Sequence, residues 1–311
     1  MSWGSVSHYQ QDIQKLERYL PLLHNLVHHI DSIGDKSLSI QLTQKLGISW
    51  TSPLTLSPAS PYFLDDLWGP KSFLINNLRF ELGIVLFFYG AMLREWGSQV
   101  LSTDLLQSAT LLRRAAGVYL YLACEFLPIV KDAQSSEWPP EATVPVCYVM
   151  HLICLAESQI VAIMKAKEQK PADIHLLRLH CGIVQQFDWA MIYYSTATNE
   201  CKSFSPILME YMSCYKVLYE LKSYKYMAEA AKAEGNHGTA IELLFKALYN
   251  VQISVGGTES WQKVIKQEVD TLEDMLNKYG FPLDHQLPPG KLITTSINYG
   301  PQRLEQTLAL K

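Results

Sequence analysis

The sequence lacks the short motifs that usually reveal an enzyme site. It contains no Gly-x-Ser-x-Gly turn for a serine nucleophile, and neither of the common glycine-rich phosphate loops. Its cysteines form no Cys-x-x-Cys pair, the spacing typical of zinc and redox sites. We therefore expect a protein that is not an enzyme and that needs no cofactor or metal ion. An enzyme whose site is assembled from distant residues remains the third hypothesis.

The chain also lacks the features of a secreted protein. It has six cysteines, at positions 124, 147, 154, 181, 201 and 214. Disulfide frameworks are typical of short secreted chains, and this long sequence begins without a signal-peptide pattern. All of the cysteines except Cys201 fall in apolar or amphipathic stretches. We expect reduced thiols that are mostly buried, in a cytoplasmic protein.

Long apolar runs and a strong net charge are absent as well. The longest apolar run, residues 82–93, has about a dozen residues, whereas a membrane-spanning helix needs roughly 20. The 26 basic residues are nearly balanced by 30 acidic ones, so the formal net charge is −4. No overall basic field attracts nucleic acid or an acidic membrane. We expect no transmembrane segment, no nucleic-acid partner, and membrane association that is indirect or peripheral.

What the sequence does contain is helical periodicity. Near the N-terminus apolar residues recur at every third or fourth position, at Tyr9, Ile13, Leu16, Leu20, Leu23 and Val27. This spacing lines one face of an amphipathic α-helix. The same pattern predicts seven or eight helices, over residues 5–30, 71–99, 103–131, 140–167, 171–197, 206–234, 239–251 and 259–278.

Helix length and turn length together predict the architecture. Several of the predicted helices span about 28 residues, which is roughly 40 Å at about 1.5 Å per residue. Short turns join most of them, so neighbouring helices must lie antiparallel. We predict an all-α fold, an elongated curved bundle of long antiparallel helices with a tetratricopeptide-like core. Its main domain covers residues 1–290 and an extended C-terminal tail covers 291–311.

Two interruptions stand out from the helical pattern. Residues 34–70 contain four prolines close together, at positions 53, 58, 61 and 70, and we expect an extended connector there. Residues 230–241 read as a tight turn between two helices. Gly235 and Gly238 are expected to supply unusual backbone angles, and Asn236 to cap the following helix. This hairpin resembles a single tetratricopeptide repeat, without an array around it.

Two histidines one helical turn apart are the strongest metal candidate. His24 and His28 have the spacing that places two imidazoles on one metal ion, and His29 follows. No glutamate stands beside His24, and no third acidic ligand is close in sequence. A surface histidine cluster is the better interpretation.

Four segments, in order along the chain, resemble the endosomal-targeting BRO domain family. They are Arg79–Phe87 together with Trp50-Thr51, Leu112–Leu122, Leu155–Gln159 continuing to Lys165-Ala166, and Gly235–Ala247. The resemblance covers about residues 50–288. It implies a curved helical domain that binds proteins and catalyses nothing. The family domain normally begins with a further strand and helix, so its N-terminal part is expected to be missing here.

The resemblance also implies a partner and a site. Family members dock the amphipathic C-terminal helix of an ESCRT-III subunit in an apolar groove, and so recruit adaptors to endosomes for multivesicular body sorting. The groove positions correspond to Ala162, His175 and Leu179, of which only Leu179 keeps the apolar character. Leu176 is expected to substitute on a slightly rotated face, and Met164 and Ile183 to border the groove.

A second hypothesis keeps the helical fold but changes the partner. The chain would be a scaffold for another protein, such as a signalling protein or a ubiquitin ligase, bound on the concave or convex surface. Exchanging Leu179 for aspartate separates the two hypotheses, because only groove binding depends on that side chain.

Overall fold

The computed structural model is a row of long helices. It describes residues 8–32, 48–55, 72–75, 78–130, 138–169, 173–201, 204–254 and 258–280. The helices are α1 (His8–Ser32), α3 (Leu78–Val100), α4 (Leu105–Tyr121), α5 (Leu127–Val130), α6 (Val144–Lys167), α7 (Asp173–Glu200), α8 (Ile207–Ala233), α9 (His237–Ser254) and α10 (Glu259–Lys278).

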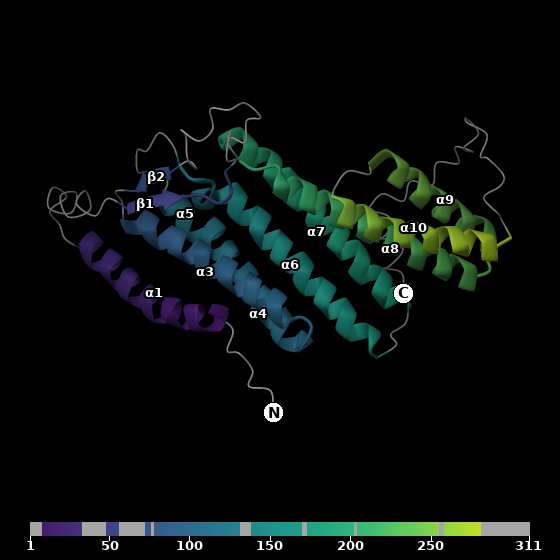
Figure 1. Ribbon diagram of the computed structural model, residues 1–311, viewed down its shortest axis with the longest axis horizontal. Helices are drawn as coiled ribbons and strands as arrows, with labels where there is room; N and C mark the ends of the chain where they lie inside the picture. Colours follow the sequence, from purple (N-terminus) through teal and green to yellow (C-terminus); the bar gives the residue numbers. More distant parts are fainter. Residues whose placement is uncertain are drawn as a thin grey trace.

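Neighbours in the sequence are neighbours in space (Figure 1). Helix α1 packs on α3, α3 on α4, α4 on α6, α6 on α7, α7 on α8 and α8 on α9, while α10 returns to lie against α8 and α9. The molecule is therefore elongated, with α1 at one end and α9 and α10 at the other. The predicted all-α fold is confirmed. The proposed boundary at residue 290 and the C-terminal tail lie outside the described residues.

One predicted helix begins later than expected. Strands β1 (Ile48–Thr51) and β2 (Ser72–Ile75) pair antiparallel, with Trp50 opposite Phe73. The helix predicted from residue 71 therefore starts only at Leu78. The sequence Ser-Phe-Leu-Ile continues the apolar pattern of that helix, and only its distant partner strand makes it extended. Much of the predicted connector, residues 34–47 and 56–70, lies outside the described residues.

The main core forms where small residues let helices approach closely. Gly90 of α3 faces the ring of Tyr119 on α4, and a Cβ built at Gly90 would lie 2.9 Å from that ring. Tyr119 itself is fully buried, as are Leu93, Ile153 and Phe187 in the same core. The close approach of α3 and α4 thus depends on the missing side chain at residue 90.

Helices α8, α9 and α10 enclose a second core, which includes Leu244 and Leu272. The turn between α8 and α9 contains Gly235 with φ of +81°, the left-handed conformation expected there. The carbonyl of Asn236 accepts from the Ala240 amide at 3.1 Å. Gly238, in contrast, is the second residue of α9 and has ordinary helical geometry, so the prediction of an unusual angle there was wrong.

The helix predicted over residues 103–131 is interrupted. Its first residue, Leu105, lies close to the predicted start at residue 103, and Asp104 caps α4, since its Oδ1 accepts from the Gln107 amide at 2.9 Å. A π-helical turn, Leu122–Phe126, then separates α4 from α5. Such turns insert one extra residue into the hydrogen-bond ladder, which apolar spacing alone does not reveal.

The expectation that no segment has the length and apolar composition of a membrane-spanning helix is not met by α6. Among the described residues, this one helix is long and apolar enough by length and composition. However, 56% of its most apolar stretch is buried inside the fold, because α4 and α7 cover it. His151, Glu157 and Gln159 interrupt the apolar residues of α6, so no long uninterrupted apolar run marks this helix in the sequence.

All six cysteines are free thiols. Cys147, Cys154 and Cys214 are buried as expected, and Cys201 is buried too, although its sequence context did not suggest it. Cys124 is exposed on the π-helical turn, so the expectation of buried thiols does not hold for it.

Candidate functional site

The predicted groove falls where α6 and α7 approach most closely. Gly182 of α7 has no side chain, and the amide of Gln159 on α6 occupies the adjoining space. Gln159 Nε2 donates to the carbonyl of Leu179 at 2.6 Å, and Gln186 Nε2 donates to Gln159 Oε1 at 3.0 Å. A polar bridge therefore holds the two helices at a fixed spacing beneath the predicted groove.

Three of the predicted residues surround this bridge. Ala162 lies three residues after Gln159 on α6, and His175 lies one turn before Leu179 on α7, so each shares a helix face with its neighbour. Ala162 and His175 are exposed, while Leu179 is half-buried and packs against the main core. The structure thus brings Ala162, His175 and Leu179 to one surface, which we call the α6–α7 surface.

The other three predicted residues are not on this surface. Leu176 and Ile183 are 5% and 0% exposed, and both belong to the main core. They support the α6–α7 surface from below and offer no contact area to a partner. Met164 is 42% exposed, but it lies five residues after Gln159, about 140° around α6, and so on a different side of the helix.

Exposed apolar residues on α7 extend the α6–α7 surface and were missed in the sequence. Trp189 is 51% exposed and lies about 80° around α7 from Leu179, whereas Ile192, 56% exposed, lies about 140° away on a different side of the helix. The rings of Tyr148 on α6 and Tyr193 on α7 stack with centroids 4.6 Å apart. Helical spacing marks these residues as apolar but cannot tell an exposed apolar residue from a buried one. Trp189 and the stacked rings of Tyr148 and Tyr193 add a large contact area at the far end of the surface.

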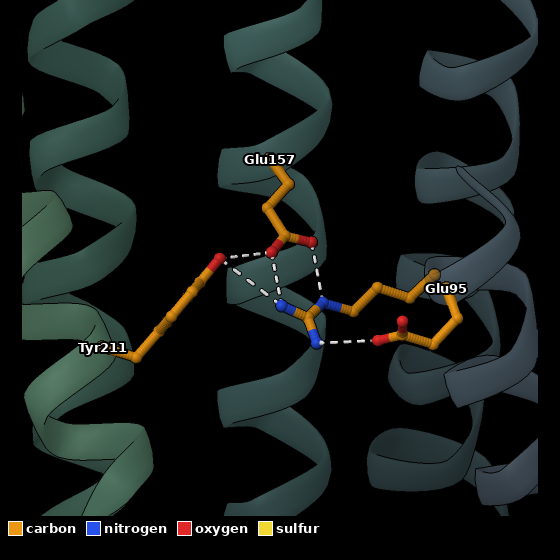
Figure 2. Close-up of polar contacts among 4 residues, drawn as sticks. Glu95, Glu157 and Tyr211 are labelled. Atoms are coloured by element: carbon orange, nitrogen blue, oxygen red, sulfur yellow. Dashed lines mark hydrogen bonds and ion pairs between the residues drawn. The ribbon is translucent and has the colours of Figure 1, made fainter. Parts of the chain in front are cut away.

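On another side of α6, a buried ion pair ties three helices together. Arg94 of α3 makes a two-pronged contact with Glu157, with Nε to Oε2 at 2.8 Å and Nη2 to Oε1 at 2.5 Å. Figure 2 shows Tyr211 of α8 reaching the same carboxylate, to which its hydroxyl donates. Glu95 lies farther out, 3.8 Å from Arg94 Nη1.

The electrostatics of this cluster are those of a structural clamp. Burial alone would lower the pKa of Arg94, but hydrogen bonds and the charge of Glu157 outweigh it, so the pKa is raised. Burial, followed by the Glu157 charge, raises the pKa of Tyr211. Both groups therefore keep their protons across the physiological range. The hydrogen bonds and the ion pair of this cluster connect α3, α6 and α8 and hold them in register.

The histidine candidate for a metal site is not supported by the geometry. His24 and His28 are both exposed on α1. Within the described residues, no group of three or more His, Cys, Asp or Glu side chains could hold a metal ion. The α6–α7 surface, which carries three of the predicted residues, is the candidate functional site.

Comparison with known proteins identifies the fold. A family model described as the BRO1-like domain matches residues 3–279. A solved structure described as the structure basis for endosomal targeting by the Bro1 domain matches with a TM-score of 0.63 and 15% identity, over 92% of this chain and 74% of that chain. By sequence, no curated protein matches.

Two further solved structures share the fold. The ALIX BRO1 CHMP4C complex matches with a TM-score of 0.55 and 16% identity, over 90% of this chain and 81% of that chain. ALIX in complex with the SIVmac239 PYKEVTEDL late domain matches with a TM-score of 0.56 and 17% identity, over 90% of this chain and 42% of that chain. At such identities the likeness concerns the fold alone.

Proposed function

Because this chain belongs to the BRO1-like domain family, we propose that it is a non-enzymatic adaptor of the endosomal sorting pathway. It docks the amphipathic C-terminal helix of an ESCRT-III subunit on the α6–α7 surface. The ALIX BRO1 domain forms a complex with CHMP4C, which supports this class of partner. The chain then works in the cytoplasm and reaches endosomes through its partners.

The observation that carries the proposal is the α6–α7 surface itself. It offers a half-buried leucine, Leu179, between two exposed small or polar side chains, with Trp189 farther along α7. Helix-in-groove recognition needs apolar anchors at turn spacing, and Leu179 and Trp189 provide two of them about three turns apart. Ala162 leaves room above Gln159, so a bulky side chain of the partner helix is expected there.

The test exchanges the central apolar contact for a charge. Leu179→Asp should weaken binding of a synthetic ESCRT-III C-terminal helix by at least about 2 kcal/mol, roughly thirtyfold, as measured by fluorescence anisotropy. Leu106→Asp is the matched control, because Leu106 is 76% exposed on α4, which does not contribute to the α6–α7 surface. Thermal unfolding of both variants checks that Leu179→Asp, whose site is half-buried, still folds.

Two results would reject the proposal. Wild-type protein that binds no ESCRT-III helix at micromolar concentrations would exclude this partner. A Leu179→Asp protein that is folded and binds as tightly as wild type would move the contact elsewhere, and would favour a helical scaffold for a different protein. Trp189→Ala then measures how far the contact extends along α7, with a smaller loss expected at this end.

A further inference from the structure

Three lysines gather around a buried histidine on the inner side of α7. Lys167 comes from the last turn of α6, and Lys222 and Lys225 come from α8. Lys222 Nζ lies 5.0 Å from the ring centroid of Tyr219, and Lys225 Nζ lies 6.0 Å from that of Tyr226. We call Lys167, Lys222 and Lys225 the lysine cluster.

The same two tyrosines connect the lysine cluster to His180. The imidazole centroid lies 5.6 Å from the ring of Tyr219 and 5.0 Å from that of Tyr226. His180 is 0% exposed. The rings of Tyr219 and Tyr226 therefore contact the imidazole, and a lysine ammonium group lies over each of these two rings.

The lysine cluster is only partly neutralised. Lys222 pairs with Glu268 of α10 at 3.5 Å, and Glu229 follows Lys225 by one turn on α8. Burial lowers the pKa of Lys167, and repulsion from Lys222 and Lys225 lowers it further against the attraction of Glu268. A lysine whose charge is opposed by two neighbouring ammonium groups is stabilised by any arrangement that adds negative charge.

His180 has an unused hydrogen-bonding atom. Its Nδ1 lies 2.6 Å from the carbonyl oxygen of Leu176, which can only accept, so Nδ1 carries the proton. Nε2 is then a bare acceptor, and it is buried without a partner. Unpaired buried polar atoms are rare and costly, so each of them calls for an explanation.

We propose that the lysine cluster binds a phosphate monoester group, carried by a soluble inositol phosphate or by the headgroup of a phosphoinositide lipid. Lysine ammonium groups are compact point charges suited to a rounded anion, whereas a carboxylate would be better matched by the flat fork of an arginine. A phosphate monoester carries between 1.5 and 2 negative charges near neutral pH, more than one carboxylate can offer to three cations.

His180 reports on the occupied site. Burial lowers the pKa of His180 from 6.5 to about 4, and the fields of Lys167, Lys222 and Lys225 add to this against the Leu176 hydrogen bond. A bound dianion offsets the lysine fields, so the pKa of His180 rises when the phosphate binds. When the pH falls below this raised pKa, the added proton occupies Nε2, because Nδ1 already carries one.

This site is separate from the surface assigned to the partner helix. Leu179 and His180 are adjacent on α7, but successive residues of an α-helix point about 100° apart. Leu179 packs beside Gln159 on the α6–α7 surface, while His180 faces the tyrosines of α8. The inference therefore does not depend on the proposed function, and the two can fail independently.

The first experiment titrates the protein with inositol 1,4,5-trisphosphate at 0.15 M salt by calorimetry. We expect Lys167→Gln and Lys225→Gln each to weaken binding about tenfold, or about 1.4 kcal/mol. Lys246→Gln is the control, because it removes the same charge from an exposed position on α9. No binding by wild type, or equal losses in all three variants, would overturn the proposal and leave a general attraction of charges.

A second readout tests the geometry. Proton NMR titration of the His180 ring, assigned with His180→Gln, should show its pKa rising by about one unit or more when the trisphosphate saturates the protein. An unchanged His180 pKa with the compound bound would place the phosphate away from this site. Because Lys167 is exposed and Lys225 half-buried, the lysine variants are expected to fold, and thermal melting verifies it.

Vesicles distinguish the two sources of the phosphate. Phosphatidylcholine vesicles with phosphatidylinositol monophosphate should recruit the protein, in competition with the soluble trisphosphate, if the source is a lipid. No recruitment, together with binding of the trisphosphate, assigns a soluble compound. Equal recruitment by phosphatidylserine vesicles, unaffected by Lys225→Gln, contradicts a phosphate site.

Discussion

At the scale of single residues, the structure places a few polar side chains in an otherwise apolar bundle. The guanidinium of Arg94 and the carboxylate of Glu157 are only 23% and 15% exposed, and they connect α3 with α6. Such a pair adds little net stability compared with apolar side chains of similar size. Removal of one partner, however, leaves the other charge buried without a counter-charge, which is strongly destabilising. The pair, with Tyr211, thereby specifies how three helices meet.

The first prediction concerns this pair. Glu157→Gln should lower the free energy of unfolding by roughly 3 kcal/mol, because Arg94 is left largely buried without its main counter-charge. Urea denaturation measures the loss. Glu168→Gln is the control, since Glu168 pairs with Lys165 where both side chains are more than half exposed, and should cost less than about 1 kcal/mol. Equal losses would argue against a clamp at Glu157.

The second prediction concerns pH. The pKa of His180 is about 4 in the folded protein, against an ordinary value of 6.5. Between these values the unfolded chain binds more protons, so stability is complete above pH 6.5 and is lost as the pH falls towards 4. The loss should reach about 3 kcal/mol. Urea denaturation across this range measures it.

The control for the pH prediction is an exposed histidine. His180→Gln should flatten the pH profile of the unfolding free energy between 4 and 6.5. His24→Gln, on the exposed side of α1, should leave the profile as steep as in wild type. A profile unaffected by His180→Gln would assign the acid sensitivity to other groups.

At the scale of elements, helix contacts depend on absent side chains as much as on present ones. Gly90 lets α3 approach the ring of Tyr119, and Gly182 lets the amide of Gln159 lie between α6 and α7. Gly117, although it is also in a helix, has no neighbouring atom within 4 Å of an added Cβ. Replacing a helical glycine with alanine is therefore expected to have opposite effects on stability at Gly90 and at Gly117.

The third prediction uses this contrast. Gly90→Ala should destabilise the protein by about 1–2 kcal/mol, because overpacking against Tyr119 outweighs the better helix propensity of alanine. Gly117→Ala should stabilise it by up to about 1 kcal/mol, because only the helix propensity changes. Thermal unfolding of the two variants provides the comparison. Stabilisation by Gly90→Ala would show that α3 and α4 can move apart without cost.

At the scale of the whole molecule, the two largest apolar cores among the described residues both include residues of α8. Leu244 of α9 and Leu272 of α10 belong to the second core, whereas Ile153 of α6 belongs to the main one. Helices α9 and α10 lie together at one end of the molecule (Figure 1). The end unit is therefore expected to open while the main body remains folded.

The fourth prediction tests this independence by hydrogen exchange. Leu272→Ala should accelerate exchange in α9 and α10 by about a hundredfold, for a cavity cost of about 3 kcal/mol. Ile153→Ala should accelerate exchange in α4 and α6 but leave α9 and α10 unchanged, because Ile153 stays packed when only the end unit opens. Acceleration of α9 and α10 by Ile153→Ala would mean that the molecule unfolds as one unit.

Features that depend on residues close in sequence could be predicted from the sequence, and features that depend on distant residues could not. The helices and the turn at Gly235 depend on residues close in sequence, and both were predictable from spacing and residue type. Strand β2 was not, since its partner β1 lies more than twenty residues earlier and its own residues continue a helical pattern. The contact of Arg94 with Glu157 joins residues 63 positions apart, and charged residues in helices ordinarily indicate solvent.

The candidate site divides in the same way. The family resemblance alone pointed to α6 and α7 as the site, and Leu179 is on their shared surface. That Leu176 and Ile183 are buried, and that Trp189 and Ile192 are exposed, depends on where the neighbouring helices lie. The lysine cluster around His180 combines residues from α6, α7 and α8, so no local pattern could have indicated it.

The sequence by itself determined that this protein is a set of long amphipathic helices of the BRO1 type, without the motifs of a catalytic site. Apolar spacing acts through the few residues of each helix turn, so it can be read along the chain. Only the tertiary structure decided which helix faces are covered, which charges are buried, and which side chains of α6, α7 and α8 lie near one another. Those properties arise between helices, from distances that the order of residues does not contain.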